Sequence, residues 1–293
     1  MLSSKQVVFL AIVGILFTTA GYFFSLTAPK NQRINLQLLW QEAQLDCQAI
    51  FNAGAEHKTW SIEQFQFFIS DIQMGSESSG WRSVDLVPSP FQSNDTVLLG
   101  TNCRAAKQKN SSERDSNWTI ELAPSVDMSA SSSIRFTLGV PFAVNHLNPI
   151  SQPSPLNLPS MFWVWQTGHK FVRLELASQN EQWLFHLGST GCKSASVMRA
   201  PEQGCRYPNS VNFQLPITLA DDNNVALNLN LAALLNNVAL TPSSSCQSQQ
   251  DSVSCQQLFD NLSLVKGNSV LTNTSGVFNS IKAQSLGRGI AVE

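Results

Sequence analysis

The sequence predicts a mainly β protein, a β-sandwich with long loops, preceded by an N-terminal signal peptide or transmembrane anchor. Several short runs alternate apolar and polar residues, which is typical of half-buried strands. Clusters of Gly, Pro, Ser and Asn separate these runs and indicate turns and loops. No helical heptads and no internal repeat are present. We therefore expect residues 1–30 to be the signal or anchor and residues 31–293 to form one β-sandwich domain.

The sequence predicts individual strands from the N-terminus to the C-terminus. In the segment 32–52 the first part alternates, and Leu36, Leu38 and Trp40 would share one strand face. The segment 62–74 alternates more cleanly and is expected to be a core strand. Val97–Leu99 predicts a short strand at most. Further strands are expected at 118–122, 133–140, 161–166, 171–176 and 183–187, and in the runs 212–219 and 225–235, the last with a short helix as an alternative.

Composition excludes one class of function. The chain has a formal net charge of -2, and only 13% of its residues are charged. No basic run is present, so the sequence lacks the electrostatic pattern of a nucleic-acid-binding protein. The 43% hydrophobic content is sufficient for a sizeable core.

The N-terminal segment has the pattern of an export signal or a membrane anchor. Residues 7–28 carry no charge, and their number is close to the roughly 20 apolar residues that span a bilayer. A cleaved signal peptide and an uncleaved anchor in the inner membrane both fit this pattern. In either case the body of the protein is expected in the periplasm or on the outer surface.

The six cysteines are an even set, which favours disulfides in an oxidising compartment. Sequence alone leaves the pairing open. Short loops favour Cys192 with Cys205 and Cys246 with Cys255, which leaves Cys47 with Cys103. A four-cysteine zinc site is the rival interpretation, but no pair has the C-x-x-C spacing.

The stretch 136–209 concentrates three of the four histidines and three of the seven tryptophans. Its prolines predict a long irregular connection before residue 161. The runs 171–176 and 183–187 predict a hairpin, in which His186 would share a face with Leu174 and Leu184. A register slip of one residue would reverse that placement. In the strand expected at 161–166, Met161, Trp163 and Trp165 would form an aromatic face.

These residues carry a resemblance to a known family. The runs LGVPFAVNHLNP at 138–149, PLNLPSMFWVWQTGHKFVRLEL at 155–176 and FHLGSTGC at 185–192 resemble the MbnP-like family, together with the later Cys205, Pro208, Asn209, Cys246 and Cys255. This family supplies the four-cysteine protein of the metallo-mystery pair system, and it is related to the copper proteins MopE and CorA. The family more usually has Tyr where this chain has His169.

The resemblance implies an extracytoplasmic copper-binding protein that is not itself an enzyme. Its partner would be a di-haem cytochrome c peroxidase-like (MbnH-like) protein that oxidises a tryptophan to kynurenine. His146 and His186 lie in family-like motifs and are the expected copper ligands, since neutral imidazole binds copper well. Trp163 or Trp165 would be the oxidised residue. The role would be copper handling or electron transfer.

Other interpretations of the same residues remain open. His186 could be a core histidine that is hydrogen-bonded to a backbone carbonyl, and His146 could form a hydrogen bond within its loop. His169 is expected to be structural or exposed. The tryptophans could be core packing. The alternative function is a metal-free binding or adhesion module that uses the aromatic face at 161–165. A hydrolase ranks last, because carboxylates are sparse and no G-x-S-x-G motif is present.

Overall fold

A computed structural model describes residues 32–93, 95–106, 116–126, 128–129, 131–219, 224–265, 268–269 and 276–281. The segment 1–30, where we expect a signal peptide or anchor, lies outside these ranges. Within them, no helix has both the length and the apolar character needed to cross a bilayer. The described chain is mostly β, as the sequence predicts.

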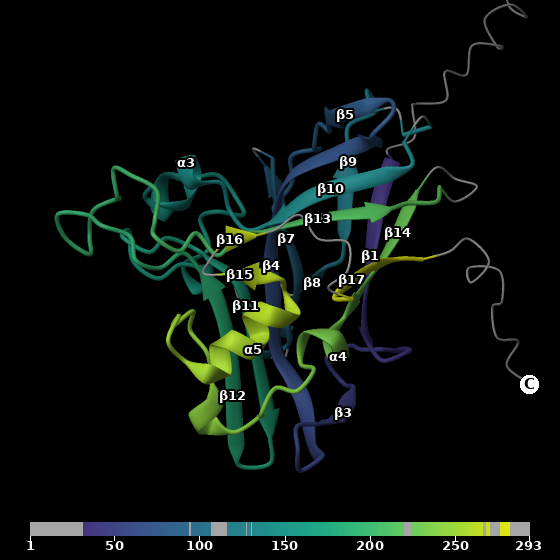
Figure 1. Cartoon of the computed structure of the whole chain (residues 1–293). Coiled ribbons are helices and arrows are strands. Elements are labelled where there is room, and N and C mark those ends of the chain that lie inside the picture. Colours follow the sequence, from purple (N-terminus) through teal and green to yellow (C-terminus); the bar gives the residue numbers. More distant parts are fainter. Residues whose placement is uncertain are drawn as a thin grey trace, which may run out of the picture. The chain divides into compact units, whose positions relative to one another are not determined.

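The central element is strand β4, Lys58–Ser76, which spans 19 residues (Figure 1). The strand is buried on both faces from Phe65 to Ser70. Its partners belong to a ten-stranded sheet of the described residues, whose main path is β12-β11-β4-β10-β13. The other strands of that path are β10 (Ser133–Leu138), β11 (Lys170–Ser178), β12 (Glu181–Gly188) and β13 (Val211–Pro216).

Shorter strands extend this sheet around β4. β3 (Ile50–Ala53), β5 (Gly80–Ser83) and β7 (Thr96–Asn102) pair with β4, whereas β6 (Gln92–Ser93) and β8 (Ser116–Asn117) pair with β7. All seven residues of β7 are buried, so this strand is longer than the short one predicted at 97–99.

A second sheet contains β1 (Gln32–Trp40), β2 (Ala43–Gln44), β9 (Thr119–Leu122), β14 (Val225–Asn230) and β17 (Phe278–Ser280). β1 and β14 run parallel. The alternation predicted for β1 is confirmed, since Leu36 and Leu38 are buried and Trp40 is partly buried. Asn230 ends β14 by capping the short helix α4, Leu231–Leu234, through its side-chain oxygen.

Aromatic packing joins the two sheets. The Phe278 ring of β17 lies 6.1 Å from that of Phe67 on β4, 5.2 Å from Phe136 on β10 and 4.8 Å from Phe213 on β13, measured between ring centroids. These rings meet edge to face, which is the favourable geometry for aromatic pairs. The expected sandwich core is therefore formed by side chains of both sheets.

The remaining described elements are short. They are α2 (Cys103–Ala106), α3 (Phe142–Asn145), η1 (Pro149–Ser151), η2 (Pro159–Met161), η3 (Pro242–Ser244), α5 (Val253–Asn261), β15 (Leu264–Val265) and β16 (Asn268–Ser269). Helix α5 was not predicted, because its surroundings are rich in Ser and Gln. It buries Cys255, Leu258 and Phe259, whose spacing of three and four residues places them on one face of the helix.

The hairpin predicted at 171–187 is confirmed as β11 and β12, but the predicted register is wrong by one residue. Arg173 lies opposite His186, and Leu174 lies opposite Phe185. Directly opposed residues of an antiparallel pair share a face. His186 therefore shares its face with Arg173 and Glu175, not with Leu174, and Val172, Leu174 and Leu176 occupy the other face.

The close approach of β4 and β7 at Gly100 can be tested by substitution. A Cβ at Gly100 would lie 1.9 Å from the Phe65 carbonyl oxygen, whereas a Cβ at Gly80 would meet nothing within 4 Å. Both glycines have positive φ, 109° and 80°. Gly100→Ala should therefore lower the free energy of unfolding by about 3 kcal/mol or more, and the control Gly80→Ala by about 1 kcal/mol. Equal losses in chemical denaturation would contradict the close approach.

Candidate functional site

The loops before β11 and after β12 gather around α3, beside the ten-stranded sheet (Figure 1). Asn145, the last residue of α3, holds them together. Its side-chain oxygen accepts a hydrogen bond of 2.8 Å from the His169 backbone N–H, and its amide nitrogen lies 3.5 Å from Ser189 Oγ. A Cβ at Gly168 would lie 2.6 Å from Asn145 oxygen atoms, so this junction requires glycine.

The prediction of a strand at 161–166 is wrong. Met161 ends the turn η2, and Phe162 forms one isolated bridge with His169. The chain then turns back, because the N–H groups of Thr167 and Gly168 both donate to the Val164 carbonyl. Because the chain turns back at Val164, Met161, Trp163 and Trp165 do not share a strand face. Met161 is fully buried, whereas the Trp163 and Trp165 side chains are half-buried in different surroundings.

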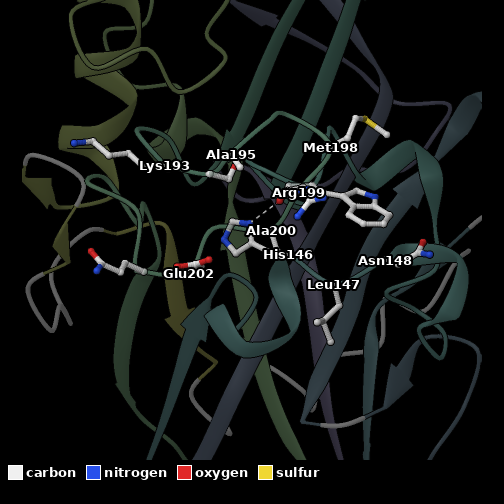
Figure 2. A pocket seen from close by; sticks show the side chains of 12 residues that line it. His146, Leu147, Asn148, Lys193, Ala195, Met198, Arg199, Ala200 and Glu202 are labelled. Atoms are coloured by element: carbon white, nitrogen blue, oxygen red, sulfur yellow. Dashed lines mark hydrogen bonds between the residues drawn. The ribbon is translucent and has the colours of Figure 1, made fainter.

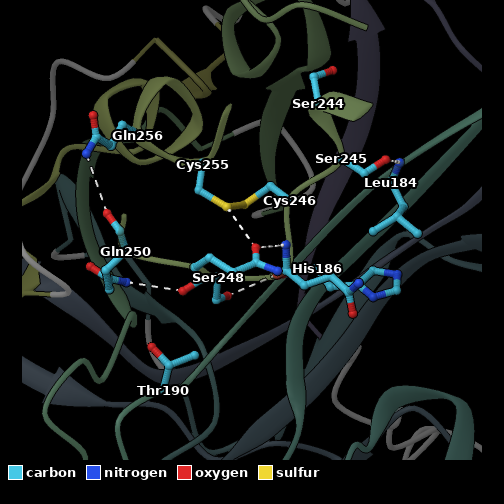
Figure 3. The surroundings of a disulfide bond; sticks show 12 residues. Leu184, His186, Thr190, Ser244, Ser245, Cys246, Ser248, Gln250, Cys255 and Gln256 are labelled. Carbon is cyan, nitrogen blue, oxygen red and sulfur yellow. Dashed lines mark hydrogen bonds between the residues drawn. A yellow bond between two sulfur atoms is a disulfide. The ribbon is translucent and has the colours of Figure 1, made fainter. Parts of the chain in front are cut away.

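His186 lies on β12, whose backbone is held from both sides. Besides β11, the segment around the Cys246–Cys255 disulfide pairs with it, since the His186 N–H donates to the Cys246 carbonyl at 2.8 Å. The Ser248 hydroxyl donates to the His186 carbonyl at 3.0 Å. Figure 3 shows these bonds and the His186 ring directed away from the disulfide. The ring position is therefore fixed by rigid elements.

The His186 ring faces Glu175, which the sequence analysis did not single out as a site residue. The distance from Nε2 to Glu175 Oε1 is 3.0 Å. Arg173 Nε donates to the same oxygen at 2.7 Å, and Arg104 Nη1 donates to the other oxygen at 2.6 Å. Glu175 and His186 are 8% and 7% exposed. Only the correct register brings this carboxylate to the histidine, which explains why the sequence pattern missed it.

Charge and burial fix the protonation of this pair. Burial alone would raise the pKa of Glu175, but the hydrogen bonds from His186 and Arg173 outweigh it and hold the pKa well below the usual range. Burial lowers the pKa of His186, and the hydrogen bond to Glu175 offsets only part of that effect. A neutral ring that donates from Nε2 carries a lone pair on Nδ1. Among the described residues Nδ1 has no hydrogen-bond partner, although it is buried.

Trp163 lies beside His186. Their ring centroids are 6.4 Å apart, and the Lys170 ammonium lies 6.0 Å from the centroid of Trp163. A Cβ at Gly188 would approach the Trp163 ring to 2.6 Å, so glycine at this position of β12 makes room for the indole. Trp163 therefore belongs to the surroundings of His186.

His146 follows α3 and has separate partners. Its Nδ1 lies 3.0 Å from the Trp165 carbonyl, which can only accept, so the proton is on Nδ1. Burial lowers the pKa of His146, and the Trp165 carbonyl only partly offsets this. The lone pair is then on Nε2, which accepts a hydrogen bond of 3.2 Å from the Asn145 amide and lies 3.7 Å from Cys205 Sγ.

His146 and the Trp165 side chain line an open cleft of about 820 Å³. The other wall is formed by the loop between Cys192 and Cys205, including Lys193, Met198, Arg199 and Glu202. Figure 2 shows His146 between Lys193 and Glu202 on one side and Met198 and Asn148 on the other. Large apolar side chains are exposed on the same loops: Phe142, Leu147, Ile150, Val197 and Met198.

The other two histidines have different roles. His169 is fully buried, and its ring nitrogens lie 2.9 Å from the Asn145 carbonyl and 3.0 Å from the Leu156 carbonyl. Burial lowers its pKa more than these carbonyls raise it. The ring therefore braces the loop from inside, in agreement with the expected structural role. His57 is exposed in a turn.

The structure contains the disulfides Cys192–Cys205 and Cys246–Cys255, which the short loops favoured, and Cys47–Cys103, the pair that they left. No described cysteine is left for a four-cysteine zinc site. Disulfides persist in oxidising compartments, so they indicate an extracytoplasmic protein.

Comparison with known proteins defines the class: a family model named MbnP matches residues 29–251, which is most of the chain. The chain therefore belongs to the MbnP family. A solved structure, MbnP from Methylosinus trichosporium, has the same fold with a TM-score of 0.72. The match covers 85% of this chain and 97% of that chain at 20% sequence identity. No curated protein matches the chain.

The buried histidines should make stability depend on pH. Their pKa values lie below the ordinary 6.5 in the folded protein, so below about pH 6.5 the unfolded chain takes up protons that the folded chain does not. The free energy of unfolding should fall between about pH 7 and pH 5.5, by up to about 1.4 kcal/mol per pH unit for each histidine. His186→Gln should reduce that slope. Constant stability in denaturant titrations over this range would contradict the assignment.

Proposed function

We propose that this MbnP-family protein binds copper outside the cytoplasm through His186 and His146 and acts in copper handling or electron transfer. The observation that carries the proposal is the unpartnered Nδ1 of His186. A histidine that binds a metal usually donates its other ring N–H to a carboxylate, which orients the ring and makes it a better donor. The Glu175–His186 pair has this arrangement.

The chemistry of the two histidines suits copper. Neutral imidazole suits copper, and the lowered pKa of His186 keeps the ring neutral around neutral pH. Within the described part of the chain, the buried Nδ1 makes no hydrogen bond that a metal would have to displace. His146 is also neutral, and its Nδ1–H is fixed by the Trp165 carbonyl, so Nε2 offers the second lone pair. When bound, copper would supply one-electron chemistry.

Maturation is the second part of the proposal. A di-haem cytochrome c peroxidase-like partner would oxidise a tryptophan to kynurenine near the metal. Trp163 is the better candidate, because its ring lies 6.4 Å from that of His186. Trp165 remains the alternative, because it lines the cleft beside His146.

A metal-free binding module is the second candidate function, although not through the strand face expected at 161–165. The observation that favours it is the apolar rim of the cleft. Leu147 is 47% exposed and Met198 is 60% exposed, and both line the cleft, from two different loops. Exposed apolar side chains that cluster around a cleft mark interaction sites more often than scattered ones do.

Copper binding can be tested on His186. His186→Gln should abolish or strongly weaken binding of one copper ion per chain, and Glu175→Gln should weaken it by about 10- to 100-fold, since it loses only the carboxylate that orients the ring. The measurement is competition for copper against a chromophoric chelator. His57→Gln is the matched control, because it removes an exposed histidine far from the site in sequence, and it should bind as the wild type does.

Wild-type binding by the His186→Gln protein, with its fold intact by circular dichroism, would refute the proposed ligand. His146→Gln addresses the second donor. It should weaken binding without abolishing it if His186 supplies the main bond.

Tryptophan oxidation can be tested by peptide mapping after co-expression with the di-haem partner. We expect the modification on Trp163, so Trp163→Phe should eliminate it and Trp165→Phe should leave it in place. Trp183, which is 1% exposed and donates to the Ser244 carbonyl, is the internal control and should stay unmodified. Modification of Trp165 alone would contradict the assignment of Trp163 and would place the oxidised residue in the cleft beside His146.

A further inference from the structure

The Cys192–Cys205 disulfide and the His146 ring form a compact group of soft donors. Nε2 of His146 lies 3.7 Å from Cys205 Sγ. The ligand atoms of His146, Cys192 and Cys205 all lie within 4.8 Å of one another, and all three residues are buried. In the oxidised protein the two sulfur atoms are bonded to each other and cannot act as thiolate ligands.

We propose that reduction of this disulfide converts the group into a Cu(I) site with two thiolates and one imidazole. A dithiol reductant would be oxidised to its own disulfide and would supply two electrons and two protons to the Cys192–Cys205 bond. The two thiols would then release their protons as they bind Cu(I). This goes beyond the proposed function, because the sulfur donors have no part in the copper site of the oxidised protein.

The backbone keeps the two cysteines together without the disulfide. Thr190 and Tyr207 exchange hydrogen bonds of 2.9 and 3.0 Å, and the Arg206 N–H donates to the Gly191 carbonyl at 3.3 Å. These bonds close the neck of the loop immediately beside both cysteines. Loss of the S–S bond would therefore release the loop at 193–204 while the two sulfur atoms stay side by side.

The histidine already has the tautomer that the site needs. Its Nδ1–H donates to the Trp165 carbonyl, so the Nε2 lone pair faces the sulfur atoms. The Asn145 amide also approaches Nε2 at 3.2 Å, but Ser189 Oγ is a second acceptor for it at 3.5 Å. A metal on Nε2 would displace this hydrogen bond and leave the Asn145 amide the one to Ser189.

Charge and access favour the thiolates and a soft metal. Lys193 directly follows Cys192, and Arg206 directly follows Cys205. Neighbouring cations favour the thiolate form. Thiolates select soft ions such as Cu(I). Cys192 and Cys205 are each 8% exposed, whereas Cys246 and Cys255 are fully buried. Reductant and metal therefore reach the Cys192–Cys205 disulfide more easily than the Cys246–Cys255 disulfide.

The test compares oxidised and reduced intact protein under anaerobic conditions. Peptide mapping establishes that a phosphine reductant has opened Cys192–Cys205. Competition with a chromophoric chelator then measures Cu(I) affinity, and X-ray absorption detects copper–sulfur bonds. Reduction should raise the affinity at least tenfold and introduce copper–sulfur scattering. His146→Gln should keep the sulfur signal but lose about tenfold in affinity.

Two controls locate the sulfur donors. The double variant C192S/C205S, and wild-type protein alkylated at both thiols, should show no copper–sulfur bonds, whereas C47S/C103S should behave as the wild type. The alkylated sample needs no refolding. Absence of copper–sulfur bonds in the reduced wild type, their persistence in C192S/C205S, or unchanged affinity in His146→Gln would each overturn the proposal.

The same samples separate this proposal from the proposed function. His186→Gln should retain the copper–sulfur signal after reduction, because His186 is not a member of the thiolate group. Copper bound by the oxidised wild type through nitrogen donors, with no sulfur signal after reduction, would overturn the thiolate site and leave the proposed function standing.

Discussion

The backbone pairing of β4 is the constraint on which the structure depends. Between Phe65 and Ser70 the strand is buried on both faces, so its N–H and C=O groups have no access to water and must pair with neighbouring strands. β7, β10 and β11 each supply such pairing. β11 in turn sets the register of β12 and therefore places His186 opposite Arg173. The position of the candidate copper ligand thus follows from the hydrogen bonding of a core strand.

A second consequence of this packing is that the negative charge of the buried Glu175 carboxylate must be stabilised by neighbouring donors. Glu175 on β11 receives hydrogen bonds from Arg104, Arg173 and His186, two of which come from other elements. An isolated buried carboxylate would be expensive, whereas one with several donors remains ionised. Because the arginines already carry the positive charge, the histidine can stay neutral. A neutral ring with one nitrogen committed to Glu175 is what leaves the other nitrogen available to a metal.

The sequence predicted the mainly β class, the hairpin and the two strands β1 and β4, because their alternation is long and regular. It failed where tertiary pairing overrides a local pattern. The apolar and aromatic run at 161–166 is typical of a strand, yet Gly168 and the hydrogen bond from the His169 N–H to Asn145 turn the chain back. The one-residue slip of the hairpin moved His186 to the apolar face, and no local signal reports such a slip. Glu175 was consequently missed as its partner.

The two histidines differ in how their surroundings are built, and this difference separates two chemistries. His186 is held by strands on both sides and faces a carboxylate, which suits a fixed site that changes little on metal binding. His146 lies between two loops, faces a disulfide and opens to a cleft. A donor on loops can adjust its distance to a partner whose own geometry changes, as two cysteines do when their bond opens. The sheet therefore fixes the candidate ligand His186, whereas the group of His146, Cys192 and Cys205 is placed by loops.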